Sequence, residues 1–273
     1  MFLKSIENKI TYFIKKITEF PLIKINDQIV QNKTIKKIPN NLYQTWENNL
    51  FGKTHYKEMI KFRSINKDLN FYLFDRNKRD DYMKKNWGDH KISENYDKSK
   101  FGQIKADIFR YCILYEYGGY YFDISKGCKV SITSLHNHDT EALISYEPIE
   151  CVIPPDRIIF NKLKYPLNNF LQWGFGFKKN HPILLSMIDN ITQDYKNYKN
   201  ISFEKPKSAI LAFSGTGQFT KVVREYILKK GVENIEQANI YFNGNGIFSM
   251  RGSRVRHLLV KEYADVRNQP IIS

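Results

Sequence analysis

Apolar and polar positions along the chain alternate between short strand-like runs and longer stretches with helical spacing. The strand-like runs fall at residues 41–45, 71–74, 120–123, 142–146 and 172–177. The helical stretches fall at residues 56–65, 76–86, 101–117, 182–198 and about 217–230. Strands that alternate with helices predict a largely parallel sheet covered on both faces, so the predicted fold class is α/β.

Two further stretches are interpreted from local composition. Residues 84–100 are polar and charged with few apolar positions, which favours a mobile loop over a site or an insertion. The Gly-Asn-Gly turn after Asn243 favours a final hairpin. No linker rich in Pro, Gly or Ser divides the 273 residues, so we expect one domain with appendages.

The first twenty residues carry a separate amphipathic pattern, in which lysines lie largely between apolar residues. The apolar residues are Phe2, Leu3, Ile6, Ile10, Phe13, Ile14 and Ile17. Such a basic helix either lies in the surface of an anionic membrane or packs its apolar stripe on the domain, and the pattern leaves both readings open. We therefore divide the chain into residues 1–35, a helix and connector, and residues 36–273, the main domain.

The stretch from Phe101 to Ser125 carries the strongest chemical signal. Between Ile104 and Tyr115 nearly every position is apolar, as expected of a helix packed inside the domain. Asp107 and Arg110 interrupt this run and share one helix face, because they are three residues apart. Burying the pair is costly unless the two side chains satisfy each other or a polar ligand. A structural ion pair and a ligand site are both consistent with this pattern.

That helix leads directly to a further carboxylate. Gly118 and Gly119 predict the helix end, because glycine enters the left-handed cap conformation freely. Residues 120–122 read as a short buried strand, and Asp123 follows at its carboxyl end. Ligands of open α/β sheets bind beyond the carboxyl ends of strands. Asp123 is therefore expected to meet a ribose, a sugar hydroxyl or a metal.

The basic composition is compatible with several classes of anionic partner and does not identify which one binds. The net charge of +15 supports attraction to membrane lipids, nucleotide diphosphates or nucleic acid. No helix-turn-helix, zinc-finger or RNA-binding signature accompanies the charge, so we expect no nucleic-acid partner. Cys112, Cys128 and Cys151 lack the paired spacing of a zinc site. With no run near 18 uninterrupted apolar residues and no signal-peptide pattern, we expect a cytoplasmic protein, with the inner membrane face as a peripheral location.

Five motifs in order give the chain a family resemblance. They are Ile38 to Trp46, Ser64 to Asp75, Phe101 to Ser125, Asn168 to Phe170 with His181-Pro182, and Ser214 to Thr220. Together they resemble the DXD-containing sugar transferases of glycosyltransferase family 32, which include fungal initiating mannosyltransferases and bacterial capsule transferases. The resemblance implies a single Rossmann-like nucleotide-sugar-binding domain of the GT-A type, with a mostly parallel central sheet and added helices.

The resemblance also implies a function. The expected reaction moves a hexose or N-acetylhexosamine from a nucleotide-diphosphate sugar to a glycan or lipid-linked acceptor. Retention at the anomeric carbon and a place in polysaccharide or glycoconjugate synthesis are implied as well. The alternative from another class is a catalytically silent protein that binds nucleotide sugars or glycans.

Site residues follow from the matched motifs. Donor-binding residues would be Gln44, Thr45, Trp46, Asp107, Arg110, Tyr121, Asp123 and Ser125, with Asp107, Arg110 and Asp123 as the catalytic set. The acceptor or the diphosphate would meet Lys126, Gly215, Thr216 and Gly217. Structural alternatives stay open, because Trp46 can be a core residue and the turn at Ser214 to Thr220 can be an ordinary helix start.

One departure from the family pattern bears on the cofactor. The namesake Asp-x-Asp motif reads Asp123-Ile124-Ser125 in this chain. The implied cofactor is Mn²⁺ or Mg²⁺, for which Asp123, Ser125 and His257 are the candidate ligands, but hard cations favour charged oxygens over a hydroxyl. Three alternatives stay open: a metal held by Asp123, water and a distant residue; a metal-free site in which a cation such as Lys126 neutralises the diphosphate; or binding without turnover. In the metal-free case the arginines between Arg251 and His257 are a second source of positive charge for the diphosphate.

Overall fold

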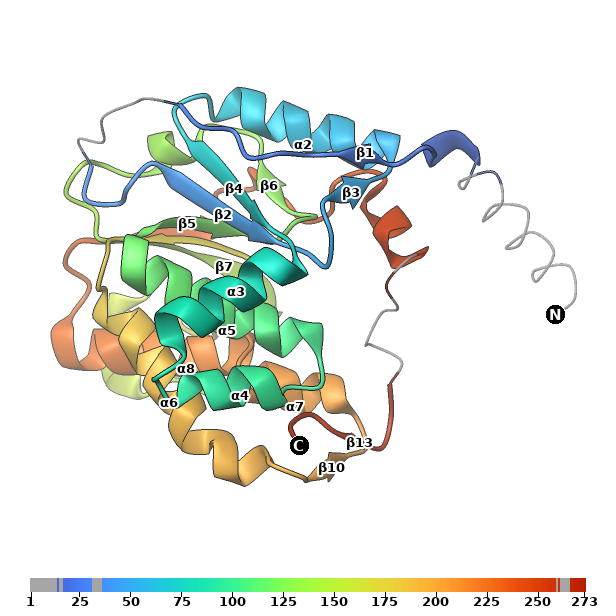
Figure 1. Ribbon diagram of the computed structural model, residues 1–273. Helices are drawn as coiled ribbons and strands as arrows, with labels where there is room; N and C mark the ends of the chain where they lie inside the picture. Colours follow the sequence, from blue (N-terminus) through green and yellow to red (C-terminus); the bar gives the residue numbers. More distant parts are fainter. Residues whose placement is uncertain (1–13, 15–16, 31–35, 259, 261–265) are drawn as a thin grey trace, which may run out of the picture.

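The computed structural model describes residue 14 and residues 17–30, 36–258, 260 and 266–273 (Figure 1). Its centre is a seven-stranded sheet in the order β11-β7-β9-β5-β2-β4, with β8 paired to β7. The strands are β2 (Asn41–Thr45), β4 (Asn70–Phe74), β5 (Gly119–Phe122), β7 (Ala142–Glu150), β8 (Asn168–Phe170), β9 (Gly174–Phe177) and β11 (Ile235–Ile240). Only β8 and β9 run against the common direction of the sheet. The predicted α/β fold with a mostly parallel sheet is confirmed.

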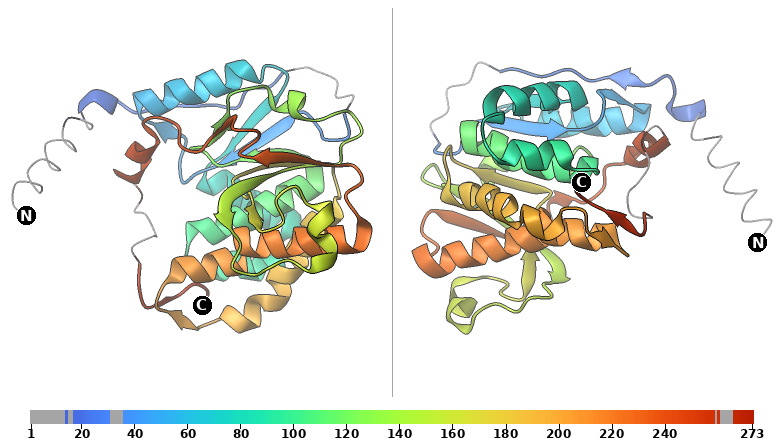
Figure 2. Two further views of the ribbon diagram at one scale, coloured as in Figure 1. Left: turned by 180° about the vertical axis from the view of Figure 1, so that it is seen from behind. Right: turned by 60° about the horizontal axis from the view of Figure 1, so that its bottom comes forward.

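Helices cover both faces of the sheet (Figure 1), and the views in Figure 2 show the same layering. One face carries α2 (Lys53–Ile65). The other face carries α3 (Arg76–Trp87), α4 (Ile92–Lys98), α5 (Gly102–Tyr117), α6 (Pro182–Tyr198), α7 (Pro206–Phe213) and α8 (Thr216–Lys230). All the strands and helices predicted from periodicity form, with some ends shifted by a few residues.

Short elements complete the chain around this body. The two-residue strands are β1 (Ile23–Lys24), β3 (Leu50–Phe51), β6 (Gly127–Cys128), β10 (Ser202–Phe203), β12 (Gly246–Ile247) and β13 (Gln269–Pro270). The 3-10 helices are η1 (Ile132–Leu135), η2 (Arg157–Lys162) and η3 (Ser253–Leu258). Of these, η3 matters for function, because it brings a distant part of the chain to the edge where β2 and β5 end.

Strand β5 illustrates how the sheet separates two cores. Tyr120 and Phe122 pack on the α2 side, where Phe122 lies 5.6 Å from the ring of Phe62. Tyr121 points to the opposite side and joins the core formed with α5. All four residues of β5 are buried, and this is the environment that a continuous apolar run predicts for a central strand. The residue after β5 is therefore held by a strand that is fixed on both faces.

The two glycines before β5 are required by the backbone. Gly118 has φ +66° and Gly119 has φ +111°, both in the region that side chains rarely adopt. A Cβ on Gly119 would also lie 2.4 Å from the carbonyl oxygen of Asn41 in β2. The prediction that glycine ends this helix is confirmed, and the close approach lets β5 pair with β2 immediately after the turn.

The prediction of a loop at residues 84–100 was wrong. The segment completes α3 and then forms α4, in which Ile92, Asn95 and Tyr96 are buried. These three positions share one helix face, so the helix packs on α5 and α6 although its other residues are polar. Most residues of the segment lie on the exposed face and are polar, so the average composition does not reveal the three buried positions.

The predicted final hairpin was also wrong. Strand β11 pairs parallel with β7, and β12 pairs antiparallel with β6. Between them Tyr241, Phe242, Asn243 and Gly244 all have positive φ, so the chain turns away from β11 instead of returning along it. Phe242 is fully buried and stacks on Phe122 at 5.6 Å, so core packing determines the path of the turn.

The predicted amphipathic helix lies largely outside the described residues. Of its apolar positions only Ile14 and Ile17 are described, and both are exposed. Glu19 is buried, and its Oε2 accepts a hydrogen bond of 2.8 Å from the backbone N–H of Thr54. Within the part of the chain that the structure describes, no helix has the length and apolar character needed to cross a membrane.

Candidate active site

A cleft of about 570 Å³ lies at the carboxyl ends of β2, β4 and β5, within the usual range for small-molecule sites. Parallel pairing of these three strands brings the residues that follow them to one edge of the sheet. Helices α5 and α7 and the distant η3 supply the remaining walls. Among the described residues that line the cleft, six are Lys or Arg and three are Asp or Glu.

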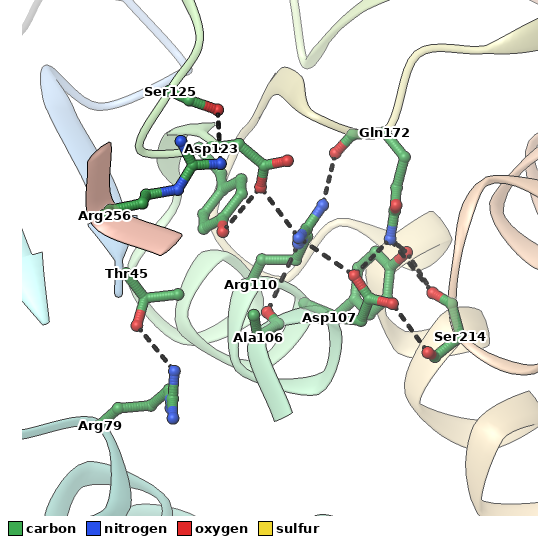
Figure 3. A network of polar contacts seen from close by, with 12 residues as sticks. Thr45, Arg79, Ala106, Asp107, Arg110, Asp123, Ser125, Gln172, Ser214 and Arg256 are labelled. Carbon is green, nitrogen blue, oxygen red and sulfur yellow. Dashed lines mark hydrogen bonds and ion pairs between the residues drawn. The ribbon is translucent and has the colours of Figure 1, made fainter. Parts of the chain in front are cut away.

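A buried polar network forms the floor of the cleft, and Figure 3 shows it centred on Arg110. Its Nη2 lies 3.0 Å from Oδ1 of Asp107 and 3.0 Å from Oδ1 of Asp123. Its Nη1 donates to the carbonyl oxygen of Gln172 at 2.8 Å. Arg110 is only 4% exposed, so both carboxylates are joined through one buried guanidinium. The predicted pairing on one helix face is present, and it extends to the end of β5.

Asp107 is held from three sides. The Gln172 side-chain amide donates to its Oδ1 at 2.9 Å, and the Ser214 hydroxyl donates to its Oδ2 at 2.8 Å. Burial raises the pKa of Asp107 to about 6, although Arg110, Ser214 and Gln172 each favour the ionised form. Ser214 belongs to the predicted turn before α8, so this turn supports the floor of the site.

Asp123 is the more accessible of the two carboxylates. Its side chain is 34% exposed, against 7% for Asp107. The Tyr121 hydroxyl donates to Asp123 Oδ1 at 3.1 Å, and the backbone N–H of Asp123 donates to the carbonyl oxygen of Trp173 at 2.8 Å. Asp123 is thus fixed by β5 and the start of β9 while its carboxylate borders the cleft.

A second buried arginine, Arg79, was missed by sequence reasoning. It is 2% exposed, and its Nη1 donates to the Thr45 hydroxyl at 3.2 Å (Figure 3). Its Nε donates to the Tyr96 hydroxyl at 3.0 Å, and its Nη2 lies 3.4 Å from Glu47. Because Tyr96 belongs to α4, the unrecognised helix is what buries Arg79. The residue therefore ties the end of β2 to the helical layer.

Trp46 and Arg256 contact each other in one wall of the cleft. The guanidinium carbon of Arg256 lies 4.9 Å from the ring centre of Trp46, a cation–π contact. Nη2 of Arg256 lies 3.5 Å from the Ser125 hydroxyl (Figure 3). The His257 ring meets Trp46 edge-on at 5.5 Å. Thr45, Trp46, Tyr121, Ser125 and His257 all line the cleft, as do the three predicted catalytic residues.

The remaining predicted site residues lie outside the cleft lining. Gln44 is buried, and its Nε2 has no hydrogen-bond partner among the described residues. Nζ of Lys126 donates to the carbonyl oxygen of Phe248 and lies 3.4 Å from the centre of the Phe248 ring. The Thr216 hydroxyl donates to the carbonyl oxygen of Phe170 at 2.9 Å, and Gly215 precedes α8. Gly217 borders a separate small cavity beside Arg224.

The candidate ligands do not make a fitting set for a divalent metal. Asp123 is the one carboxylate among the three residues predicted to bind it, and its Oδ1 already accepts from Arg110 and Tyr121. The Ser125 hydroxyl faces a guanidinium, and Nδ1 of His257 lies 3.1 Å from the carbonyl oxygen of Val260. Within the described residues no group of three His, Cys, Asp or Glu side chains could hold a metal ion. Mg²⁺ and Mn²⁺ favour several charged oxygens, which this arrangement does not offer.

Residues 24–142 match the family described as "Glycosyltransferase sugar-binding region containing DXD motif". The resemblance predicted from the sequence is confirmed. The matched stretch contains Trp46, Asp107, Arg110 and Asp123, so it includes the floor and one wall of the cleft. Gln172, Ser214 and Arg256 lie beyond the match and complete the site from the rest of the chain.

Two curated relatives extend the similarity past the matched region. "Inositol phosphoceramide mannosyltransferase 3" of Schizosaccharomyces pombe is 27% identical over 196 residues, which cover 68% of this chain and 47% of the relative. "Initiation-specific alpha-1,6-mannosyltransferase" of Candida albicans is 25% identical over 209 residues, covering 70% of this chain and 54% of the relative. The chain thus spans about half the length of the curated relatives it matches.

This chain also resembles a solved structure. A chain named "PaToxG Glycosyltransferase" is 18% identical to this one, and the alignment covers 82% of this chain and 77% of that chain with a TM-score of 0.46.

Proposed function

We propose that this chain is a glycosyltransferase that moves a sugar from a nucleotide-diphosphate donor to a glycan or lipid-linked acceptor. The observation that carries the proposal is the Asp107–Arg110–Asp123 network at the end of β5. It lies inside the region matched to glycosyltransferase sugar-binding domains. The cleft above it is large enough for a small-molecule donor.

The charges around the cleft suggest how a donor would lie. The floor network holds two carboxylates and one guanidinium, so its net charge is negative when both acids are ionised. Its carboxylates can accept hydrogen bonds from the hydroxyl groups of a ribose or hexose. Cations gather at the walls, where Arg76, Lys100 and Lys207 are exposed and Arg256 is half-buried. Phosphate oxygens would therefore meet the walls while the sugar meets Asp123.

The chemistry proposed is displacement at the anomeric carbon. The bond from that carbon to the diphosphate oxygen breaks, and the oxygen of the acceptor hydroxyl forms the new bond on the same face of the sugar. The acceptor proton passes to the departing phosphate, so charge is balanced. Stabilising the leaving diphosphate would be the largest single contribution of the protein, because negative charge develops there in the transition state.

A mannosyl donor is the first candidate, because both curated relatives are named as mannosyltransferases. One of these relatives is named for inositol phosphoceramide, a lipid. A lipid-linked acceptor for this chain would be compatible with its charge of +15, which favours an anionic surface. We therefore propose a peripheral position at a membrane for the acting enzyme.

The test is turnover of a panel of UDP- and GDP-sugars by the purified chain, read as released nucleotide diphosphate. Release from one donor that falls at least ~100-fold in Asp123→Asn would support the proposal. Asp139→Asn is the matched control, because Asp139 is an exposed aspartate outside the cleft lining and should keep full activity.

Two other outcomes have different meanings. If a donor binds tightly but no nucleotide diphosphate is released with any acceptor tried, the chain is better described as a catalytically silent binder. Ser125 in place of an acid favours this alternative. If no member of the panel binds or turns over, the proposed function is wrong.

A further inference from the structure

A cluster of aromatic rings lies beside the cleft, next to Asp123. Its members are Trp173, Tyr241 and Phe248, and we call them the aromatic platform. The ring centre of Trp173 lies 5.8 Å from that of Tyr241 and 6.4 Å from that of Phe248, and the last two are 5.9 Å apart. The carbonyl oxygen of Trp173 accepts the backbone N–H of Asp123 at 2.8 Å. The platform therefore begins one hydrogen bond away from the end of β5.

The platform is buried at its base and open at its outer side. Trp173 is 6% exposed, Tyr241 is half-buried and Phe248 is 56% exposed. An isolated exposed apolar side chain needs no explanation, but grouped aromatic surface beside a small-molecule cleft is typical of a place where a ligand binds.

The backbone turn after β11 fixes the orientation of the platform. Tyr241 has φ +45° and Phe242 has φ +53°, values that are uncommon and costly for residues other than glycine. Phe242 is fully buried against Phe122, while Tyr241 packs on Trp173. A Cβ on Gly246 would lie 3.1 Å from Cη2 of Trp173, so glycine permits the close approach of this segment. A ligand would thus meet rings that are already in place.

The loop after β5 is joined to the platform by Lys126. Its Nζ donates to the carbonyl oxygen of Phe248 and lies 3.4 Å from the centre of the Phe248 ring and 5.4 Å from that of Trp173. The backbone N–H of Met250 donates to the carbonyl oxygen of Ser125 at 2.7 Å, which adds a second link between the same segments. Lys126, which was predicted to face the acceptor or the diphosphate, therefore supports the ring of Phe248.

A carboxylate without a hydrogen-bond donor accompanies these rings. Glu147, on β7, is half-buried, and its side chain accepts no hydrogen bond within the described part of the chain. Burial raises the pKa of Glu147, and the nearby Lys126 ammonium opposes this effect. The charge of Glu147 in turn contributes to the raised pKa of Tyr241, so the carboxylate lies near the platform. It is available to accept a hydrogen bond from a ligand.

We propose that the aromatic platform and Glu147 bind the acceptor, and that the acceptor is a glycan whose terminal pyranose stacks on Phe248 and Tyr241. The inference rests on the proposed function, because it assigns the second substrate of the same transfer. A sugar bound here would lie next to the donor sugar proposed to meet Asp123.

The chemistry of the platform favours a sugar over a membrane surface. The C–H groups on one face of a pyranose suit the negative faces of aromatic rings, and its hydroxyls can donate to Glu147. An anionic membrane fits less well, because Glu147 is itself negative and the Lys126 ammonium is already engaged by Phe248.

The experiment measures transfer from the donor that the chain uses to methyl glycosides of mannose, glucose, galactose and N-acetylglucosamine. Donor hydrolysis without an acceptor is measured in parallel. We expect one glycoside to accept the sugar, and Phe248→Ala should raise its KM ~10-fold and lower the ratio of transfer to hydrolysis. Glu147→Gln should raise the same KM ~5-fold, and Phe248→Trp, which keeps a ring face, should stay within ~3-fold of the parent chain. A variant that only disturbed the fold would lower transfer and hydrolysis in the same proportion.

A matched control and a second readout make the result specific. Phe160→Ala removes an exposed phenyl ring from η2, outside the platform, and should keep the KM of the parent chain. Saturation-transfer NMR with the same glycosides and no donor measures binding alone. The glycoside that accepts the sugar should give a signal with the parent chain and with Phe160→Ala, and little with Phe248→Ala.

The outcomes separate this inference from the proposed function. If the donor is hydrolysed but no glycoside binds or accepts the sugar, or if Phe248→Ala leaves the KM unchanged, the inference is wrong while the glycosyltransferase proposal stands. If no donor is turned over, the proposed function is wrong, and loss of glycoside binding in Phe248→Ala would still support a glycan site. If Phe248→Ala instead loses binding to phosphatidylglycerol vesicles and keeps glycoside binding, the platform contacts a membrane and the inference is wrong.

Discussion

Replacing Arg110 by methionine should destabilise the protein strongly and in a pH-dependent way. The substitution keeps an unbranched apolar side chain in α5 but removes the guanidinium that lies 3.0 Å from both Asp107 and Asp123. It also leaves the carbonyl oxygen of Gln172 without its 2.8 Å donor. Asp107 would then be a buried carboxylate facing only neutral donors.

The magnitude follows from this geometry. Removing one partner of a buried ion pair costs about 3 to 5 kcal/mol, because the remaining charge is uncompensated. A domain of this kind has a total stability of roughly 5 to 15 kcal/mol, so the variant should fold with a much reduced margin. Adding Asp107→Asn to Arg110→Met should restore about 2 kcal/mol, since it removes the unpaired charge.

Urea unfolding of the parent, the two single variants and the double variant at pH 7.5 measures these differences. At pH 5 the cost of Arg110→Met should shrink, because the isolated Asp107 then binds a proton and becomes neutral. The reasoning is refuted if the destabilisation of the double variant equals the sum of the two single destabilisations within about 0.5 kcal/mol. It is also refuted if Arg110→Met costs the same free energy of unfolding at both pH values.

Three further predictions concern other parts of the site. Burial raises the pKa of Asp107 from 3.8 to about 6, so the native state holds its proton more tightly than the unfolded state. The stability of the parent relative to Asp107→Asn should therefore fall by ~2 kcal/mol as pH rises from 4 to 6, and a flat or rising difference in urea unfolding would contradict this. Gly119→Ala should cost more than ~2 kcal/mol in the same assay, owing to φ +111° and the Asn41 carbonyl, whereas Gly231→Ala, also at positive φ but with open space around it, should cost less. Trp46→Ala should weaken nucleotide binding ~10-fold by calorimetry, since it removes both a stacking surface and the ring under Arg256, and unchanged binding would assign Trp46 to the core alone.

The sequence predicted those parts of the site that depend on neighbours along the chain. Asp107 and Arg110 were found because a three-residue spacing places them on one face of a buried helix, and Asp123 was found because it follows a buried strand. Each of these inferences uses only local periodicity and the polarity of open α/β sheets. The central network was therefore predictable before any distance was known.

The partners that complete this network come from far along the chain. Gln172 and Ser214 reach Asp107 across 65 and 107 positions, through the start of β9 and the turn before α8. Arg79 carries no local sign of burial or of a ligand, because its charge resembles that of any solvated lysine-rich surface. The sequence marks Arg256 only as one of several arginines near His257 and does not show that it reaches the cleft. Their placement depends on α4 and η3, whose polar sequences conceal a few buried positions.

The most direct test of the account is a crystal structure of the chain bound to the nucleotide diphosphate that it prefers. The account predicts that the ribose or sugar lies against Asp123 and that the phosphates lie in the same cleft, beside basic residues of its walls such as Lys100 and Lys207. A diphosphate bound outside this cleft, for example in the surface depression between Trp87 and Lys179, would contradict the assignment of the site.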